Sequence, residues 1–407
     1  MKKIMLLFFY TVIGYSKVIP NSIWKDECVG YYTFSLPSAA DVALYPLKGF
    51  LDPKPKLESN GFFIVSRYAA NGITFGGEYD ISRKDTTQAQ FSSFYYGKYR
   101  LGISSKSSGA IDFNLYKEKR IDSFNFNIET AKHKEELDLD LIDKPTAMDA
   151  EFKRKYQYII KDYINAFVNY DYRGYTIYIN SEGRLYHFWS MNSKDTGNKS
   201  QTAEAQLRYS EPEVISLLKR FRSRDLYEVP VEPGFCLPYG FIAGDSGHEP
   251  RNMAVTYRLK DHPDVTIFFQ DLGMKPKAGK EDDLNDKDYV TWLWNWQYQW
   301  SAVSKELIKP KWRTIKMDGR TGQGTFVKAT YKNVPVYDSE GHVINHLNYI
   351  NYGYVAYVRG DHQARNLQPD LLLYVMQDSR QAKNNPPMNA QELEQMAEHI
   401  ISSVKRR

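Results

Sequence analysis

The sequence predicts an α+β protein of two similarly built α+β domains, each with an antiparallel sheet and packed helices. With 407 residues, the chain is longer than one hydrophobic core usually serves. Aromatic residues make up 15% of it, and they suit the pleated surface of a β-sheet. Both halves also follow one order, in which a cysteine precedes a series of strand-like segments that ends in a polar loop and a helix.

The first residues are typical of a secretory signal peptide. Lys2 and Lys3 form a short basic start, residues 4–13 are mostly apolar, and residues 14–16 offer small side chains where a signal peptidase cuts. About ten apolar residues are too few to cross a bilayer, which needs roughly 20. We therefore expect a signal peptide over residues 1–16 that is cleaved near Ser16, rather than a buried first strand, and export to the periplasm.

The charge of the mature chain excludes some partner classes. Removing Lys2 and Lys3 with the signal lowers the formal net charge from +5 by two, to +3. The basic residues are dispersed, apart from the three at 405–407, so we expect no nucleic-acid partner. No segment after the signal is long and apolar enough to span a bilayer, so we expect no stable membrane insertion.

The first half of the mature chain reads mainly as strands. Residues 28–37, 61–68 and 104–116 alternate like strands and are separated by Gly, Ser and Asn clusters. Residues 131–144 are acidic and polar, which predicts a surface segment. A hairpin is predicted at residues 175–189, where two apolar runs flank Asn-Ser-Glu-Gly.

Two helices are predicted in the same half. One covers residues 152–167, where aromatic and aliphatic residues recur at three-to-four spacing. Residues 192–209 are polar and predict a loop. The second helix covers residues 211–224, because Ser210 and Glu213 match a capping box and an apolar stripe follows.

A domain boundary is predicted at residues 225–233. Pro230 and Pro233 stop helical structure there and favour an extended chain. The expected division is an N-terminal domain at residues 17–224, a linker at 225–233 and a C-terminal domain at 234–407.

The second half repeats the order of the first. Residues 252–259, 265–269 and 371–378 read as strands, and a polar loop with prolines leads to a last helix whose apolar stripe runs from Leu393 to Val404. Residues 289–300 suit a strand or a helix, and the acidic residues ahead of them favour a helix. The tryptophans there indicate core packing or a partner contact more strongly than a sugar-stacking platform.

Cys28 and Cys236 are the only cysteines. In an exported protein, two thiols and no third one favour a disulfide, and the alternative is two unpaired buried thiols. A metal site is not expected, because the two residues are far apart and lack CxxC spacing.

Ser246 raises the question of a serine hydrolase. It lies in Gly-Asp-Ser-Gly at residues 244–247, a string that surrounds many hydrolase nucleophiles. A nucleophile elbow needs G-x-S-x-G, and His248 occupies the position of the second glycine. We therefore expect Ser246 to lie in a turn and not to act as a nucleophile. Nothing in the spacing selects His187, His248 or His262 as a triad partner.

No metal or phosphate site is convincing. His342 and His346 have the spacing of a helical zinc pair but lack the Glu of HExxH. The glycine-rich residues 319–324 lack the Lys-Ser/Thr ending of a P-loop, so turn geometry explains them better. We expect no cofactor, no metal and no enzymatic activity.

Several segments resemble one family, the Tle cognate immunity protein 4 family. Residues 28–37, just after the signal, and residues 41–45 resemble its opening. Residues 229–242, VPVEPGFCLPYGFI, look like the start of its C-terminal domain, and residues 312–316 and 319–324 are similar to a later turn of that domain. The resemblance covers most of the mature chain, and the Pro-Gly-Phe-Cys block is its most specific part.

The resemblance implies a periplasmic immunity protein. Such a protein binds and inhibits a cognate lipase or phospholipase effector of the type VI secretion system by blocking its cleft or the opening of its lid, and so prevents self- and kin-intoxication. It implies two α+β domains that grip the effector and no catalytic residues. Partner-binding residues are not assigned by it.

Two other function classes remain open from the residues alone. A periplasmic serine hydrolase would need a His and an Asp within hydrogen-bond reach of Ser246. A periplasmic carbohydrate- or envelope-binding module would need the tryptophans of residues 292–300 exposed on one flat face.

Overall fold

The computed structural model describes residues 23–51, 64–67, 70–73, 92–139, 152, 156–190, 202–274, 284–296, 302–338, 340–382 and 385–407. The expected signal peptide and its cleavage site lie outside these residues. No helix among them is long and apolar enough to cross a membrane.

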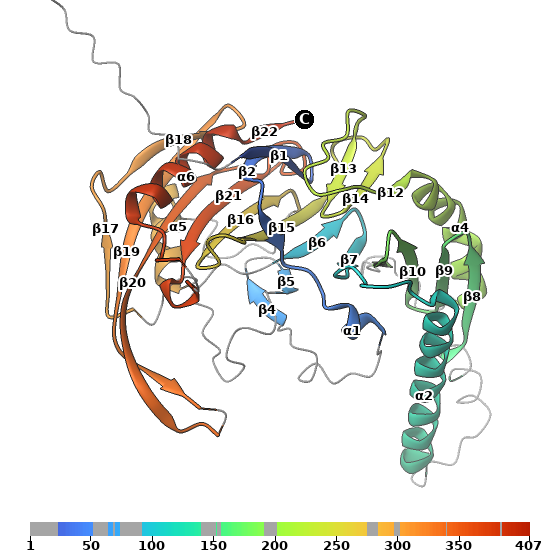
Figure 1. Cartoon of the computed structure of the whole chain (residues 1–407). Helices are drawn as coiled ribbons and strands as arrows, with labels where there is room; N and C mark the ends of the chain where they lie inside the picture. The colour runs from blue at the N-terminus through green and yellow to red at the C-terminus, as the bar shows by residue number, and fades with distance from the viewer. Residues whose placement is uncertain are drawn as a thin grey trace, which may run out of the picture.

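A fourteen-stranded antiparallel sheet runs through both halves of the chain and forms a curved layer (Figure 1). From the first half come β3 (Ala40–Val42), β6 (Ser93–Tyr96), β7 (Tyr99–Ile103), β8 (Tyr158–Tyr163), β9 (Ala166–Asp171), β10 (Gly174–Ser181) and β11 (Arg184–Ser190). From the second half come β15 (Arg251–Leu259), β16 (Val265–Leu272), β17 (Ser304–Leu307), β18 (Arg313–Met317), β19 (Arg320–Tyr337), β20 (Val343–Val358) and β21 (Asp370–Gln377).

The two halves share one strand order. Outward from the middle, the first half runs β6-β7-β11-β10-β9-β8 and the second half runs β15-β16-β21-β20-β19-β17. Helix α2 (Phe113–Leu139) follows β7 as α5 (Asp286–Trp296) follows β16, and α4 (Ala203–Arg220) follows β11 as α6 (Ala390–Ser403) follows β21. The predicted class, two similarly built α+β units, is confirmed.

Helices at equivalent positions in the two halves cover the same side of the sheet. The stripes of α4 and α6 both contribute to one large core, through residues such as Val214 and Leu393. The first turns of α2 and helix α5 instead cover separate apolar clusters, which contain Tyr116 and Leu293 respectively. Each half therefore packs one helix into a shared core and one against its own cluster.

The halves meet where β6 pairs with β15, with Phe94 opposite Met253. The sheet is thus continuous across the expected linker, which lies between β12 (Phe221–Ser223) and β13 (Gly234–Leu237). The boundary at residues 225–233 stays a prediction.

Small sheets fasten the chain ends to this junction. The hairpin of β1 (Trp24–Val29) and β2 (Tyr32–Pro37) pairs with the C-terminal strand β22 (Lys405–Arg406). Strands β12 and β13 both pair with β14 (Gly240–Ala243). The remaining elements are α1 (Leu47–Leu51), β4 (Ile64–Arg67), β5 (Ala70–Ile73) and the 3-10 helix η3 (Ser379–Gln381).

The helix predicted over residues 152–167 is wrong from Tyr158 onward, whereas Phe152 and Tyr156 at its start are helical. Residues 158–171 form the hairpin of β8 and β9, which turns at Ile164 and Asn165, and Asn165 has a φ of 54°. The hairpin carries aromatic and β-branched residues on both faces of its strands. Some of them therefore recur at three-to-four spacing, which suggested a helical stripe.

Helix α4 begins earlier than the sequence predicted. Its cap is Thr202, whose Oγ1 accepts the N–H of Ala205 at 3.3 Å, so residues 203–209 are helical and not a loop. Ser210 is no capping residue, because it lies inside the helix and its hydroxyl donates to the Gln206 carbonyl. The Ala, Glu, Gln, Leu and Arg residues of this segment are strong helix formers, and that propensity outweighs their polarity.

Helix α2 corrects two further predictions. The strand expected over residues 104–116 is not formed. Strand β7 ends before it, at Ile103, and α2 begins within it, at Phe113. The segment at 131–144, expected only as polar surface, is helical as far as Leu139, and the rest of it lies outside the described residues. This helix has polar residues on all sides, so no apolar stripe could reveal it.

Other predicted elements are confirmed. Strands β10 and β11 form the expected hairpin, and Glu182 and Gly183 both have positive φ in its turn. The described part of residues 289–300 is helix α5, and the last helix is α6. The run at 28–37 is a hairpin with a turn at Gly30 and Tyr31 and not one strand.

Candidate functional site

Ser246 lies in an exposed turn that has no catalytic arrangement. Its Oγ accepts the N–H of His248 at 3.1 Å and donates to Glu249 at 3.2 Å. His248 contacts Arg406 through Nδ1 at 3.2 Å. Among the described residues, no histidine ring forms a hydrogen bond with the Ser246 hydroxyl. Residues 244–247 therefore form a turn and not a nucleophile elbow, as the absence of the second glycine predicted.

The residue of this turn that makes long-range hydrogen bonds is Asp245. Its Oδ2 accepts the hydroxyls of Tyr31 at 2.7 Å and Tyr96 at 2.9 Å, and its Oδ1 accepts the N–H of Gly247. Burial, and then the nearby Asp245, raise the pKa of both tyrosines, so both stay protonated donors. Asp245 thus ties the β1–β2 turn and strand β6 of the first half to the second half.

The other histidines are dispersed. His187 is buried beside Tyr116, and its Nε2 forms a hydrogen bond with that hydroxyl. His262 faces Asp264 at 3.7 Å. His342 contacts Asp338 at 3.3 Å, and the described residues contain no group of three side chains that could hold a metal.

The glycine-rich residues 319–324 begin with a tight hairpin turn. Asp318 and Gly319 join β18 to β19 with φ values of 54° and 70°. Positive φ at both positions is typical of a type I′ turn, which explains the glycine without a phosphate.

The sugar-stacking platform, which was the less favoured alternative, does not form in the described part of the tryptophan segment. Trp294 is buried on α5 with Val327 and Val355, and Trp292 packs against the same cluster. The indole rings there contribute to the core of the second half.

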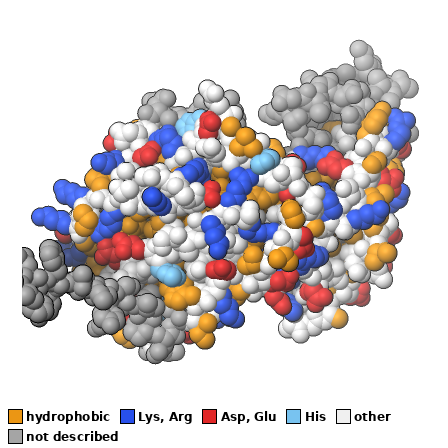
Figure 2. Space-filling view, turned by 90° about the horizontal axis from the view of Figure 1, so that it is seen from above, with side chains coloured by type: hydrophobic (Ala, Val, Ile, Leu, Met, Phe, Trp, Pro, Cys, Tyr) orange, Lys and Arg blue, Asp and Glu red, His pale blue; other side chains and the backbone are white. Residues whose placement is uncertain are grey.

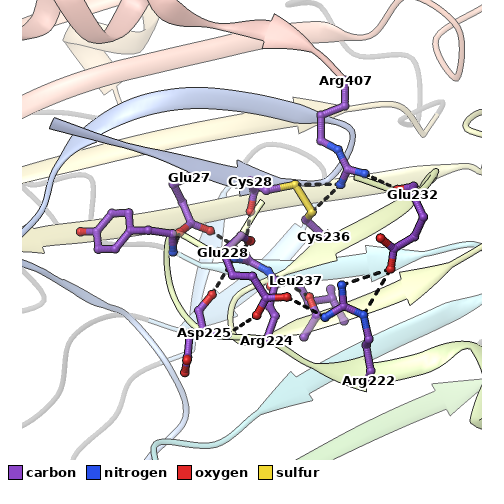
Figure 3. The surroundings of a disulfide bond; sticks show 12 residues. Glu27, Cys28, Arg222, Arg224, Asp225, Glu228, Glu232, Cys236, Leu237 and Arg407 are labelled. Atoms are coloured by element: carbon purple, nitrogen blue, oxygen red, sulfur yellow. Dashed lines mark hydrogen bonds and ion pairs between the residues drawn. A yellow bond between two sulfur atoms is a disulfide. The ribbon is translucent and has the colours of Figure 1, made fainter. Parts of the chain in front are cut away.

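Cys28 and Cys236 are joined in a disulfide at the junction of the halves (Figure 3). Cys28 belongs to β1 and Cys236 to β13, and Gly30 and Cys236 exchange two backbone hydrogen bonds of 2.8 and 2.9 Å. Arg407 extends over the bond, with its Nη1 at 3.2 and 2.9 Å from the two sulfur atoms. The C-terminal residue therefore covers the disulfide.

A buried ion pair lies next to the disulfide. Neither Arg224 nor Glu27 is exposed, and Arg224 also donates to the Cys28 carbonyl at 2.7 Å and the Leu237 carbonyl at 3.1 Å (Figure 3). Tyr227 donates its N–H to the second Glu27 oxygen. Because each charge has several partners, the pair fixes the segment after α4 against β1 and β13.

Two elements project from the same side of the curved sheet (Figure 1). The long hairpin of β19 and β20 extends from one end, and helix α2 extends from the other. Between them lie α1 and the short strands β4 and β5. The described elements thus form a curved layer with a projection at each end.

The outer part of the β19–β20 hairpin is a ribbon of only two strands, and we call residues 331–350 the distal ribbon. β21 pairs with β20 over residues 353–358, and β17 pairs with β19 over residues 327–330. Beyond those positions β19 and β20 pair only with each other among the described strands. Ile344 is 64% exposed on this ribbon, and Val343 and Ile350 are exposed too.

Helix α2 contacts the rest of the molecule through its first half. Tyr116 is buried, Arg120 donates to the Phe50 carbonyl at 2.9 Å, and Asn125 accepts the hydroxyl of Tyr158. Farther along, Phe126 is 69% exposed. With 27 residues the helix is about 40 Å long.

The surface view shows mixed charges and scattered apolar side chains (Figure 2). No single-sign field dominates that face, so electrostatic capture of a nucleic acid is not favoured. Exposed aliphatic and aromatic side chains on projecting elements suit contact with a protein instead.

A protein-family model matches the second half of the chain. Residues 228–407 match the model of the Tle cognate immunity protein 4 C-terminal domain. No curated protein matches the chain.

Solved structures of immunity proteins resemble the chain at low identity. The immunity protein TplEi of the T6SS from Pseudomonas aeruginosa, complexed with an "L" peptide, is 14% identical with a TM-score of 0.48, over 94% of this chain and 98% of that one. The apo structure of TplEi has a TM-score of 0.47 at 14% identity, over 94% and 97%. A chain of the Tle4-Tli4 complex has a TM-score of 0.48 at 14% identity, over 94% and 97%.

Proposed function

We propose that this chain is a member of the Tle cognate immunity protein 4 family, whose C-terminal domain model matches residues 228–407. It is an immunity protein that binds a cognate lipase effector of the type VI secretion system and inhibits it. The family match over residues 228–407 is the observation that carries this proposal.

The shape of the molecule supports a gripping mode of binding. We propose that residues 17–224 and 234–407 act as two arms of one clamp, with α2 on the first and the distal ribbon on the second. A lipase must open an apolar cleft to reach its lipid. An inhibitor that spans the mouth of the cleft can block it or hold a lid shut, and such contacts are apolar at the centre with a polar rim.

The buried contacts at the junction support a rigid clamp. The disulfide and the Asp245 hydrogen bonds join segments of the two halves, and Arg224, which pairs with Glu27, also donates to the Leu237 carbonyl of the second half. Because the two arms are held in place before binding, less conformational entropy is lost when the effector is captured. A rigid scaffold therefore favours tight inhibition.

The proposed compartment is the periplasm. The basic and apolar residues at the start of the chain support export, and a disulfide persists in an oxidising compartment. A binding role without catalysis is proposed as well, because Ser246 has no triad partner among the described residues.

Co-expression tests the function. The protein is produced in cells that direct each lipase encoded beside it to the periplasm. The chain should rescue growth against one lipase and co-purify with it, and the form lacking residues 1–16 should not rescue. The Ser246→Ala variant should rescue as well as the wild type. Failure against every neighbouring lipase, or equal protection from the cytoplasm, would contradict the proposal.

A further inference from the structure

The Cys28–Cys236 disulfide is buried, and an exposed side chain covers it. Neither cysteine is exposed, and Phe241 packs against both of them. Arg407 is exposed, and its Nη1 lies 3.2 Å from the Cys28 sulfur and 2.9 Å from the Cys236 sulfur (Figure 3). The guanidinium of Arg407 therefore lies between the two sulfur atoms and solvent.

Arg407 belongs to a short segment, residues 405–407, that we call the latch. Its first two residues, Lys405 and Arg406, form β22 and pair with β2. The N–H of Arg407 donates to the Tyr31 carbonyl at 2.9 Å. A segment held by so few backbone pairs at the surface opens more readily than the strands of a large sheet.

Arg406 holds the latch through partners that lie away from the sulfur atoms. Its N–H donates to Oδ1 of Asp318 at 2.9 Å, and its guanidinium donates to the Leu367 carbonyl at 2.6 Å and the Gly247 carbonyl at 2.5 Å. Val404, just before the latch, is buried. The latch can therefore open at its first residue while the core beneath α6 stays packed.

Reduction of a disulfide needs a clear path to one of its sulfur atoms. A thiolate of a dithiol reductant attacks one sulfur, forms a mixed disulfide with that cysteine and expels the other cysteine as a thiolate. The second thiol of the reductant then attacks the mixed disulfide, releases the first cysteine and closes a cyclic disulfide. Two electrons pass to the protein, and the released thiolates take protons from water.

We propose that the latch controls the access of thiols to the Cys28–Cys236 bond. While the latch is closed, Arg407 and Phe241 keep a thiolate away from both sulfur atoms. When the latch opens, the rest of the fold stays intact and the bond becomes accessible. Oxidation of the two thiols needs the same access, so the bond forms before the latch closes. The closed latch then preserves the disulfide in the presence of thiols.

The charge of Arg407 acts in the opposite direction to its position. A positive charge attracts an anionic thiolate and stabilises the thiolate that leaves, and both effects speed reduction. Removal of the charge therefore slows the reaction, whereas removal of the cover speeds it. Burial decides between the two, because a sulfur atom without exposed surface is out of reach of a thiolate whatever the local charge. The cover is therefore the larger effect.

The rate at which dithiothreitol reduces the folded, oxidised chain tests this inference. Free thiols are trapped by alkylation and counted by mass spectrometry. Arg407→Ala should be reduced faster by about tenfold or more, because the sulfur atoms lose their cover. Arg406→Ala should also be reduced faster, because it loosens the latch. The control Lys405→Ala, at an exposed position of the same strand, should be reduced at the wild-type rate.

The dependence on dithiothreitol concentration separates opening of the latch from unfolding of the whole chain. Movement of three surface residues is faster than thiol attack, so the rate should rise in proportion to the concentration of the reductant. Urea denaturation of the oxidised proteins should give the same free energy of unfolding for the wild type and the three variants. A faster reduction then reports on the latch and not on a weaker fold.

Three results would overturn the inference. If Arg407→Ala is reduced at the wild-type rate or more slowly, the charge of this residue outweighs its cover. If Arg407→Ala is faster and Arg406→Ala is not, the guanidinium acts on the sulfur atoms directly and there is no latch. If the rate does not depend on dithiothreitol, only unfolding of the chain exposes the bond. None of these measurements involves the effector, so they are independent of the proposed function.

Discussion

Arg224 and Glu27 form an ion pair in which neither side chain is exposed, although 197 residues separate them. Arg224 follows α4 and Glu27 lies in β1, so the pair holds the start of the mature chain against the end of its first half. Replacing one partner leaves a buried charge without its counterion, which is more costly than losing a surface pair.

The variant Glu27→Ala should therefore lower the free energy of unfolding by about 3–5 kcal/mol. The control is Asp162→Ala, which removes a mostly exposed partner of Lys117 and should cost less than about 1 kcal/mol. Urea denaturation measures both values. Similar costs for the two variants would mean that the buried pair does not hold the junction.

The disulfide should stabilise the same junction. It joins residues 208 positions apart, and removal of a native disulfide typically costs about 2–5 kcal/mol. The double variant Cys28→Ser/Cys236→Ser should lose this amount in urea denaturation. Adding a reductant should destabilise the wild type and leave the variant unchanged, and a wild type that does not respond would contradict a formed bond.

His187 should make stability fall in acid. Burial, and then the positive charge of Arg120, hold the pKa of His187 well below its usual value, so the folded protein keeps this ring neutral. The unfolded chain binds a proton below about pH 6.5 and the folded chain does not. Stability is therefore full above that pH and falls as the pH decreases, by up to about 1.4 kcal/mol per pH unit.

Urea denaturation between pH 7 and 5 checks this prediction. The variant His187→Phe should lose that part of the pH dependence, because it has no proton to gain. His342→Gln, at an exposed position on the turn of the β19–β20 hairpin, should keep the wild-type dependence. If His187→Phe keeps the same slope as the wild type, another group is responsible.

The exposed end of α2 should contribute to effector binding. Phe126→Asp removes an exposed aromatic side chain from this arm of the proposed clamp. An aromatic contact at the centre of an interface contributes about 2 kcal/mol or more, so the dissociation constant should rise at least tenfold. The unfolding free energy should stay the same, and the exposed-site control Ile164→Asp should bind normally. Normal binding by Phe126→Asp would remove α2 from the interface.

The sequence revealed elements with local signals and missed those that depend on distant partners. The β10–β11 hairpin and helix α6 were predictable because a turn motif and an apolar stripe are local. Helix α2 has no apolar stripe, because it projects from the molecule after its first turns. The spacing in β8 resembles a helix, and only pairing with β9 shows that it is a strand.

The candidate site followed the same limits. The Gly-Asp-Ser-Gly stretch marked a turn, but the role of Asp245 depends on Tyr31 and Tyr96, which lie 214 and 149 residues away. The distal ribbon begins where β17 and β21 stop pairing with β19 and β20. A single sequence gives no signal for where such pairing ends. The overall class was predictable because both halves repeat one order of elements.

The central claim is that this chain inhibits a cognate type VI lipase by binding it. Titration of the purified lipase with the purified mature chain, on a phospholipid substrate, measures this directly. We expect lipase activity to fall linearly to zero at one chain per lipase. The expected dissociation constant is about 1 nM, which corresponds to about 12 kcal/mol of binding free energy. A lipase that keeps its full activity in a large excess of the chain would contradict the account.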